Sequence, residues 1–195
     1  MALVALCLVG NAMATPRLVF LGDSLTAGYS LARERAYPAL IQQKIRAAGL
    51  DWDVVNAGVS GDTSAGALRR AQSLLRDPIG LLVVWIGAND GLRGQDLDAM
   101  KKNIDQILTA AQAAKVPTML VQMHIPPNYG PDYTEKFAAV YKDLAHTHGV
   151  PLIPFPMTEV AGTSDLTLSD GVHPNARGHE LIAESLWPAV RPHLK

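Results

Sequence analysis

The sequence predicts an α/β protein built on a five-stranded parallel sheet with helices on both faces. Short apolar segments alternate with longer amphipathic segments along the chain, which is the pattern of strands joined by helical crossovers. The 195 residues, 48% of them hydrophobic, suffice for one compact domain with a core on each side of a sheet. No internal repeat, low-complexity tract or linker divides the sequence, so a second domain is not required.

The first half of the chain contains two predicted strands and two predicted helices. Residues 18–21 are an apolar strand, and residues 36–48 follow as a helix with its apolar side chains on one face, which Gly49 ends. Residues 54–55 are a short second strand. Residues 63–76 are the next helix, which begins at a threonine suited to cap it and ends before an Asp-Pro pair.

The rest of the chain continues the alternation of strands and helices. Residues 81–86 are the most apolar run after the N-terminal segment and are therefore the expected central strand. A helix over residues 98–115 and a strand over residues 117–123 follow. The last elements are a helix, a brief strand and a closing helix, expected at residues 134–148, 152–153 and 175–190.

Four loops are expected to meet at one edge of this sheet. Right-handed crossovers between parallel strands place functional groups in the loops beyond the strands' carboxyl ends. The four loops are residues 22–28, 56–64, 87–94 and 170–174.

The N-terminal segment has features of a secretory signal peptide. Residues 2–9 are an unbroken apolar run, and Ala12 and Ala14 form an Ala-x-Ala ending whose cleavage would leave Thr15 first. We expect residues 1–14 to be a leader and the protein to be periplasmic or secreted. No Lys or Arg precedes Arg17, so an ordinary apolar N-terminal helix stays open as the alternative. The run is too short to anchor the protein in a membrane.

Charge, cysteine and histidine content exclude several kinds of partner. The net charge of −1 gives no electrostatic footprint for nucleic acid. Cys7 is the single cysteine, so neither an intrachain disulfide nor a cysteine-based metal cluster can form. His146 and His148 fall near a helix C-terminus, His179 and His193 are expected at the surface, and none stands at a spacing that predicts a metal site.

Three residues have the chemistry of a serine hydrolase. Ser24 follows directly on the first strand, and a serine hydroxyl becomes a nucleophile when a base takes its proton. Asp170 and His173 stand three residues apart in a turn, where the carboxylate can hold Nδ1 and leave the other nitrogen free as the base. Singly, Ser24 is also a suitable helix cap, and Asp170 also begins an Asp-Gly turn.

Two further residues can stabilise an oxyanion. Gly61 offers a backbone N–H without an obstructing side chain, and Asn89 offers a side-chain amide. Each alone is more readily explained as part of a turn. The joint pattern is harder to explain by chance than any single residue. It places a serine, a glycine, an asparagine and an Asp-x-x-His after successive elements of one sheet.

In all four blocks and in their order, the sequence resembles the GDSL, or SGNH, hydrolase family. The blocks are Gly22-Asp23-Ser24-Leu25, Gly61, Gly87-Ala88-Asn89-Asp90 and Asp170-Gly171-Val172-His173-Pro174. Residues 60–64, 89–94 and 125–130 more narrowly resemble its bacterial branch of multifunctional thioesterase I, lysophospholipase and arylesterase enzymes. The likeness covers residues 18 to about 187.

The resemblance implies a three-layer flavodoxin-like fold for residues 15–195, with no metal or cofactor. It implies Ser24 as the nucleophile, His173 as the base and Asp170 as its orienter, with oxyanion donors from the Ser24 and Gly61 N–H groups and Asn89. It further implies substrate contacts by Ala88, where the branch usually has glycine, and by the loop residues Ile125, Pro126, Pro127, Asn128 and Tyr129.

The expected function is therefore a serine esterase or thioesterase. Its expected substrates are small molecules, namely aryl or short- to medium-chain acyl esters, acyl-CoA and lysophospholipids. Two alternatives stay open: a carbohydrate or peptidoglycan O-acetylesterase, which the same blocks permit, and a non-catalytic flavodoxin-like binding module, which leaves the Asp-x-x-His pair unexplained.

Overall fold

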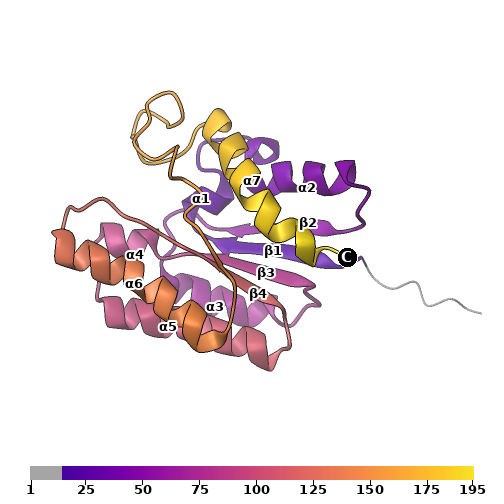
Figure 1. The fold of residues 1–195 in the computed structure, drawn as a ribbon, viewed down its shortest axis with the longest axis horizontal. Coiled ribbons are helices and arrows are strands. Elements are labelled where there is room, and N and C mark those ends of the chain that lie inside the picture. The colour runs from indigo at the N-terminus through magenta and orange to yellow at the C-terminus, as the bar shows by residue number, and fades with distance from the viewer. Residues whose placement is uncertain (1–14) are drawn as a thin grey trace, which may run out of the picture.

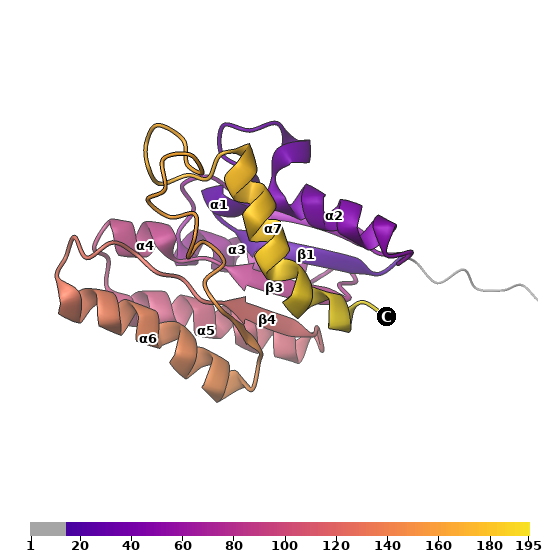
Figure 2. The same cartoon turned by 45° about the horizontal axis from the view of Figure 1, so that its top comes forward.

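Residues 15–195, which the computed structural model describes, form three layers (Figures 1 and 2). The middle layer is a sheet of five parallel strands in the order β2-β1-β3-β4-β5. The strands are β1 (Arg17–Gly22), β2 (Asp53–Gly58), β3 (Leu81–Trp85), β4 (Thr118–Val121) and β5 (Leu152–Ile153). The predicted leader, residues 1–14, lies outside the described residues.

Helices cover both faces of the sheet, as the sequence predicts. Helices α2 (Tyr37–Ala47) and α7 (Ala176–Val190) pack together on one face (Figure 1). Helices α3 (Ser64–Leu74), α5 (Leu97–Ala113) and α6 (Pro131–His148) cover the other. Short helices α1 (Ser24–Ala27) and α4 (Ala88–Leu92) follow β1 and β3, and single 3-10 turns lie at Arg33–Arg35 and Arg191–His193.

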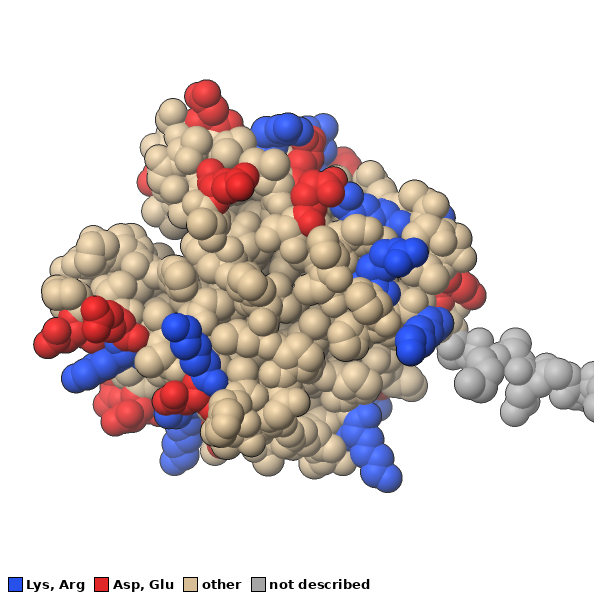
Figure 3. Space-filling view, in the orientation of Figure 1, with Lys and Arg blue, Asp and Glu red and all other residues tan. Residues whose placement is uncertain are grey.

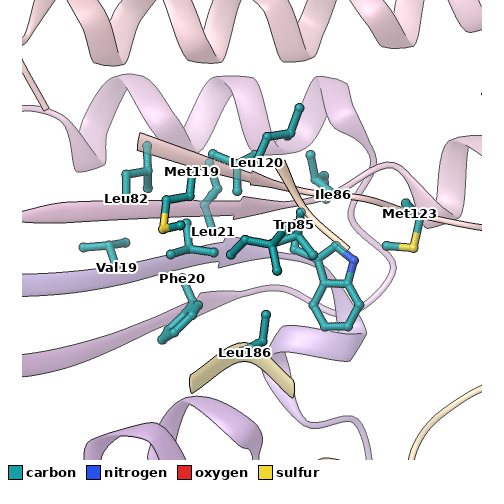
Figure 4. Close-up of a cluster of buried hydrophobic side chains, with 14 of the residues drawn as sticks. Val19, Phe20, Leu21, Leu82, Trp85, Ile86, Met119, Leu120, Met123 and Leu186 are labelled. Atoms are coloured by element: carbon teal, nitrogen blue, oxygen red, sulfur yellow. The ribbon is translucent and has the colours of Figure 1, made fainter. Parts of the chain in front are cut away.

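The core lies on both sides of β1, β3 and β4. All five residues of β3 are buried, which fits its place at the centre of the sheet. Figure 4 shows Phe20 and Trp85 on the face of the sheet that carries Leu186 of α7, whereas Leu120 points to the opposite face. The prediction of residues 81–86 as the central strand is confirmed.

Three strands end at the same level of the sheet. Gly22 at the end of β1 pairs with Gly58 of β2 and with Trp85 of β3. The loops after these strands therefore start side by side. Glycine at 58 lets α1 cross the end of β2, because a Cβ there would lie 2.2 Å from the Ala27 nitrogen.

Some elements differ locally from the predicted ones. The predicted loop 87–94 contains α4, one short helix that begins after Gly87 in a left-handed conformation. Helix α6 begins at Pro131, three residues earlier than predicted, because proline fits the first turn of a helix. Strand β4 ends at Val121, two residues before the predicted end.

The prediction that His179 lies at the surface is wrong. Its side chain is fully buried between α7 and α2, where Nδ1 accepts a hydrogen bond from the Tyr37 N–H at 3.2 Å. Burial lowers the pKa of His179 to about 4, so its imidazole is neutral near pH 7.

Within residues 15–195, no helix is both long and apolar enough to cross a bilayer.

Candidate active site

Ser24 lies at the junction of β1 and α1. Asp23 caps α1, because its Oδ1 accepts from the Leu25 N–H at 3.0 Å. Ser24 itself is the first helical residue, with a side chain that is mostly buried. The turn is tight, since a Cβ at Gly22 would lie 2.1 Å from Thr26 Oγ1. The cap is thus Asp23 and not Ser24, which leaves the serine hydroxyl available for other contacts.

The Ser24 hydroxyl is hydrogen-bonded to His173. Ser24 Oγ and His173 Nε2 are 3.0 Å apart, although the two residues are separated by 149 positions in the sequence. His173 Nδ1 lies 2.6 Å from Asp170 Oδ2. Serine, histidine and aspartate therefore form one continuous chain, and the structure brings together all three residues that the sequence singles out.

A turn holds Asp170 against His173. Asp170 Oδ1 accepts from the backbone N–H groups of Val172 and His173, each at 2.9 Å, while Oδ2 faces the imidazole. The His173 N–H and imidazole, with the Val172 N–H, lower the pKa of Asp170 to about 2. Gly171 has a φ of +67°, which this turn requires.

These contacts determine which nitrogen of His173 carries the proton. An ionised carboxylate can only accept hydrogen bonds. The hydrogen of the bond between His173 Nδ1 and Asp170 Oδ2 is therefore assigned to Nδ1, which donates it. His173 Nε2 is then an acceptor for the Ser24 hydroxyl. This is the tautomer in which the imidazole can take the serine proton.

The side chain of Tyr29 covers the imidazole of His173. The two ring centroids lie 4.4 Å apart, with the planes tilted by 35°. Tyr29 is itself 44% exposed, so this contact lies at the surface of the protein. Sequence reasoning missed this residue, because a tyrosine in a loop carries no signal for contact with a histidine far along the chain.

Asn89 faces the same pocket as Ser24. It lies in the first turn of α4, and its Nδ2 donates to the Asp62 carbonyl at 2.9 Å. Arg93 donates to Asn89 Oδ1 and to the Gly61 carbonyl, each at 3.2 Å. The amide is thus fixed from both ends, and one of its two N–H groups remains for a ligand.

The loop that contains Gly61 is tied to α4 at a second point. Asp90 accepts from the Ser64 N–H at 2.8 Å and from the Ser64 hydroxyl at 2.6 Å. Gly61 is exposed, has a φ of +79° and lies near Arg93, beside the pocket and not in its wall. The two predicted oxyanion residues therefore belong to one hydrogen-bonded unit.

A largely apolar pocket of about 430 Å³ opens beside Ser24. Of the predicted substrate contacts, Ala88, Ile125 and Pro126 line it. Pro127, Asn128 and Tyr129 lie outside its wall, and their contact with substrate stays a prediction. The notch between the loop before α7 and the α4–α6 side is visible at the left of Figure 3.

Most residues of the pocket wall were not predicted from the sequence. The missed residues come from α1, from α4, from the loop after β4 and from the long segment between β5 and α7. They are Leu25, Leu92, Met123, His124, Phe155, Met157, Ala161, Gly162, Gly171 and Val172. Nothing in the sequence distinguishes these apolar side chains from the core. His124 is the one polar side chain among them, and its ring stacks on that of Phe155 with centroids 4.9 Å apart.

Asp23 lies fully buried beneath the site. Its Oδ2 has no hydrogen-bond partner among the described residues. Burial, with a smaller contribution from the nearby Asp62 and Asp90, outweighs the opposing effect of the Leu25 N–H and raises the pKa of this carboxyl to about 7. The residue that precedes Ser24 is therefore a carboxyl group that keeps its proton close to neutral pH.

No group of three or more His, Cys, Asp or Glu side chains suited to a metal ion occurs in residues 15–195.

Comparison with known proteins places this geometry in a family. Residues 20–181 match the model of the GDSL-like lipase/acylhydrolase family. The match spans most of the chain, including Ser24, Asn89 and the Asp170–His173 turn. The chain belongs to this family.

Related proteins align with this chain over most of their length. Esterase TesA of Pseudomonas aeruginosa is 36% identical over 190 residues, which cover 97% of this chain and 94% of the relative. Thioesterase 1/protease 1/lysophospholipase L1 of Escherichia coli K12 is 40% identical over 184 residues, 93% of this chain and 86% of the relative. The esterase EstA of a Pseudoalteromonas species superposes with a TM-score of 0.87 at 36% identity, covering 90% of this chain and 97% of that structure.

The predicted family, branch and fold are confirmed by these matches. The predicted enzyme class, a GDSL hydrolase of esters or thioesters, is confirmed with them. What the individual site residues do in this family member is a separate question, which the hydrogen-bonded chain at Ser24 addresses.

Proposed function

We propose that this protein hydrolyses carboxylic esters and thioesters by two-step acyl transfer through an acyl-enzyme on Ser24. One observation carries the proposal: the continuous chain from Ser24 Oγ through His173 to Asp170, at the mouth of an apolar pocket. A polarised hydroxyl beside an apolar pocket suits a substrate with a reactive carbonyl and a hydrocarbon acyl chain.

In the first step, Ser24 Oγ attacks the acyl carbon while its proton passes to His173 Nε2. The imidazolium then protonates the leaving alcohol or thiol, and the acyl group stays on Ser24. In the second step, His173 takes a proton from water, which attacks the acyl-enzyme, and the imidazolium returns a proton to Ser24 Oγ as the acid is released. Asp170 holds the imidazole orientation and stabilises its positive charge in both steps.

The oxyanion of each tetrahedral intermediate is assigned to three donors. These are the N–H groups of Ser24 and Gly61 and the side-chain amide of Asn89. The contacts of Asn89 with Asp62 and Arg93 fix the amide before substrate arrives, and donors fixed in advance stabilise charge without reorganisation.

The pocket favours an acyl chain longer than acetyl. Its wall contains apolar side chains on four segments, among them Leu25, Met123 and Phe155. Burial of each additional methylene contributes about 0.8 kcal/mol, so kcat/KM should rise from acetyl towards medium-chain esters. We expect the same pocket to take the acyl chains of acyl-CoA and of lysophospholipids, with the leaving group outside it.

A panel of p-nitrophenyl esters and acyl-CoA thioesters from acetyl to octanoyl tests this function. We expect turnover that rises with chain length, with Ser24→Ala as the blank, and covalent labelling of Ser24 by a fluorophosphonate. A steep preference for acetyl would instead indicate an O-acetylesterase. Wild-type protein that neither turns over any ester nor takes the label would contradict the proposal in favour of a binding module.

We also propose that the enzyme is exported. The apolar run and the Ala-x-Ala ending of the first 14 residues support this, and the first described strand begins only at Arg17, so cleavage after Ala14 would remove no described element. Protein recovered from outside the cytoplasm should begin at Thr15 on N-terminal sequencing. An uncleaved N-terminus on exported, active protein would contradict the predicted cleavage site.

A further inference from the structure

We propose that Arg70 is a positioning residue that holds the three oxyanion donors, on Ser24, Gly61 and Asn89, in place relative to one another. It does not face the substrate pocket, and no sequence motif singles it out. The inference rests on the proposed function of Ser24, Gly61 and Asn89, and it assigns a role to a side chain on α3 that lies behind them.

The Arg70 guanidinium contacts the ends of two strands at once. Its Nη1 donates to the Ala57 carbonyl of β2 at 2.6 Å, and its Nη2 donates to the Gly22 carbonyl of β1 at 3.0 Å. Gly22 is two residues before Ser24, and its carbonyl also accepts from the Val59 N–H at 3.1 Å. Arg70 therefore fixes the exit of β1 against the start of the loop that contains Gly61.

The same guanidinium pairs with Asp62. Arg70 Nε and Nη2 lie 2.8 and 2.6 Å from Asp62 Oδ2. Asp62 follows Gly61 directly, and its carbonyl accepts from Asn89 Nδ2 at 2.9 Å. Arg70 is thus connected indirectly to all three proposed donors. Its bond to the Gly22 carbonyl fixes the segment that leads to the Ser24 N–H, and its pair with Asp62 fixes the Gly61 N–H and the Asn89 amide.

The surrounding chain leaves space for this ion pair. A Cβ at Gly66 would lie 1.6 Å from Asp62 Oδ1, so the Asp62 carboxylate occupies the space that any other residue at 66 would fill. The Asp62 and Arg70 side chains are 13% and 27% exposed. Charged hydrogen bonds that are shielded from water in this way are stronger than those at the surface.

Arginine is required at this position for a geometric reason. Its planar fork directs several donors towards the Asp62 carboxylate and the two carbonyls, whereas a lysine ammonium is a single point charge on a flexible stem. Lysine can keep the pair with Asp62, but it cannot hold both strand ends as well.

Loss of Arg70 should therefore act on the transition state and not on substrate binding. The acyl pocket contains no atom of Arg70, so KM should stay within about threefold of wild type. A displaced oxyanion donor costs up to 10²–10³ in kcat, so a loosened set of donors should cost about 10- to 100-fold. Arg70→Lys should fall between wild type and Arg70→Met.

The test measures kcat per competent site. Wild type, Arg70→Met and Arg70→Lys are titrated with a fluorophosphonate, and turnover of a p-nitrophenyl butyrate ester is divided by the number of labelled sites. A residue that only stabilises the fold changes the number of sites, whereas a positioning residue changes kcat at each site. Arg69→Met is the matched control, because Arg69 is the neighbouring arginine on α3 and is exposed.

We expect a lower kcat per labelled site in Arg70→Met, little change in KM, and wild-type values for Arg69→Met. An unchanged kcat per site in Arg70→Met would overturn the inference, however many sites are lost. If Arg70→Met does not fold, the same ratio in Arg70→Lys decides. Failure to label wild type, or full turnover by Ser24→Ala, would contradict the proposed function instead.

Discussion

Replacement of Ser24 by alanine should lower kcat for a p-nitrophenyl acyl ester by about 10⁴- to 10⁶-fold. Ser24 Oγ lies 3.0 Å from His173 Nε2, and alanine removes both this nucleophilic oxygen and the proton that the imidazole would take from it. Hydrolysis would then depend on unassisted attack by water. Ser73→Ala, at an exposed serine of α3, should keep wild-type turnover.

The same experiment distinguishes a catalytic unit from independent contributions. His173→Ala should cost about as much as Ser24→Ala, and the double variant should be no slower than either single one, because both residues act in one proton transfer. Costs that multiply in the double variant, or a Ser24→Ala enzyme with more than a few per cent of wild-type turnover, would be incompatible with an acyl-enzyme on Ser24.

Asp170→Asn should lower kcat by about 10³- to 10⁴-fold at neutral pH, with KM nearly unchanged. Asp170 Oδ2 accepts the Nδ1 proton of His173 at 2.6 Å. An asparagine can turn its amide N–H towards that nitrogen, which would move the imidazole proton to Nε2 and block the base. It would also remove the charge that stabilises the imidazolium.

Kinetics at fixed pH, with Asp165→Asn as control, checks this expectation. Asp165 lies in the same segment before α7 and is exposed, so the substitution changes the local charge equally but leaves the imidazole alone. Equal losses in the two variants would indicate a general electrostatic effect of the loop. A loss confined to Asp170→Asn supports the orienting role.

Elements that depend on local patterns could be predicted from the sequence. The strands and most helices follow from apolar periodicity, and Asp170 and His173 are three positions apart, where a turn alone brings them together. The approach of Ser24 to His173 depends on the strand order, which parallel crossovers restrict to few possibilities. For that reason the meeting of these two residues could be predicted although they are far apart in the chain.

Other features depend on contacts that no local pattern encodes. His179 has a polar side chain on the buried face of α7, where one hydrogen bond from the Tyr37 N–H compensates for its burial. Arg70 is one of two adjacent arginines, and only the fold decides which of them turns inwards. The pocket wall consists of ordinary apolar residues, which the sequence does not separate from the core.

The buried carboxyl of Asp23 links the stability of this enzyme to proton uptake. Its pKa is about 7 in the folded protein and 3.8 for the free side chain, so between these values the native state holds a proton that the unfolded chain releases. The stabilisation is complete below about pH 4 and is lost as the pH rises through 7. His179, with a folded-state pKa of about 4, acts in the opposite direction, and its contribution is lost as the pH falls from about 6.5.

The Asp23→Asn substitution removes only the effect of Asp23 on stability. In urea denaturation, the free energy of unfolding of the variant should therefore increase relative to that of wild type between pH 4 and pH 7. A difference that stays constant over this range would refute the linkage.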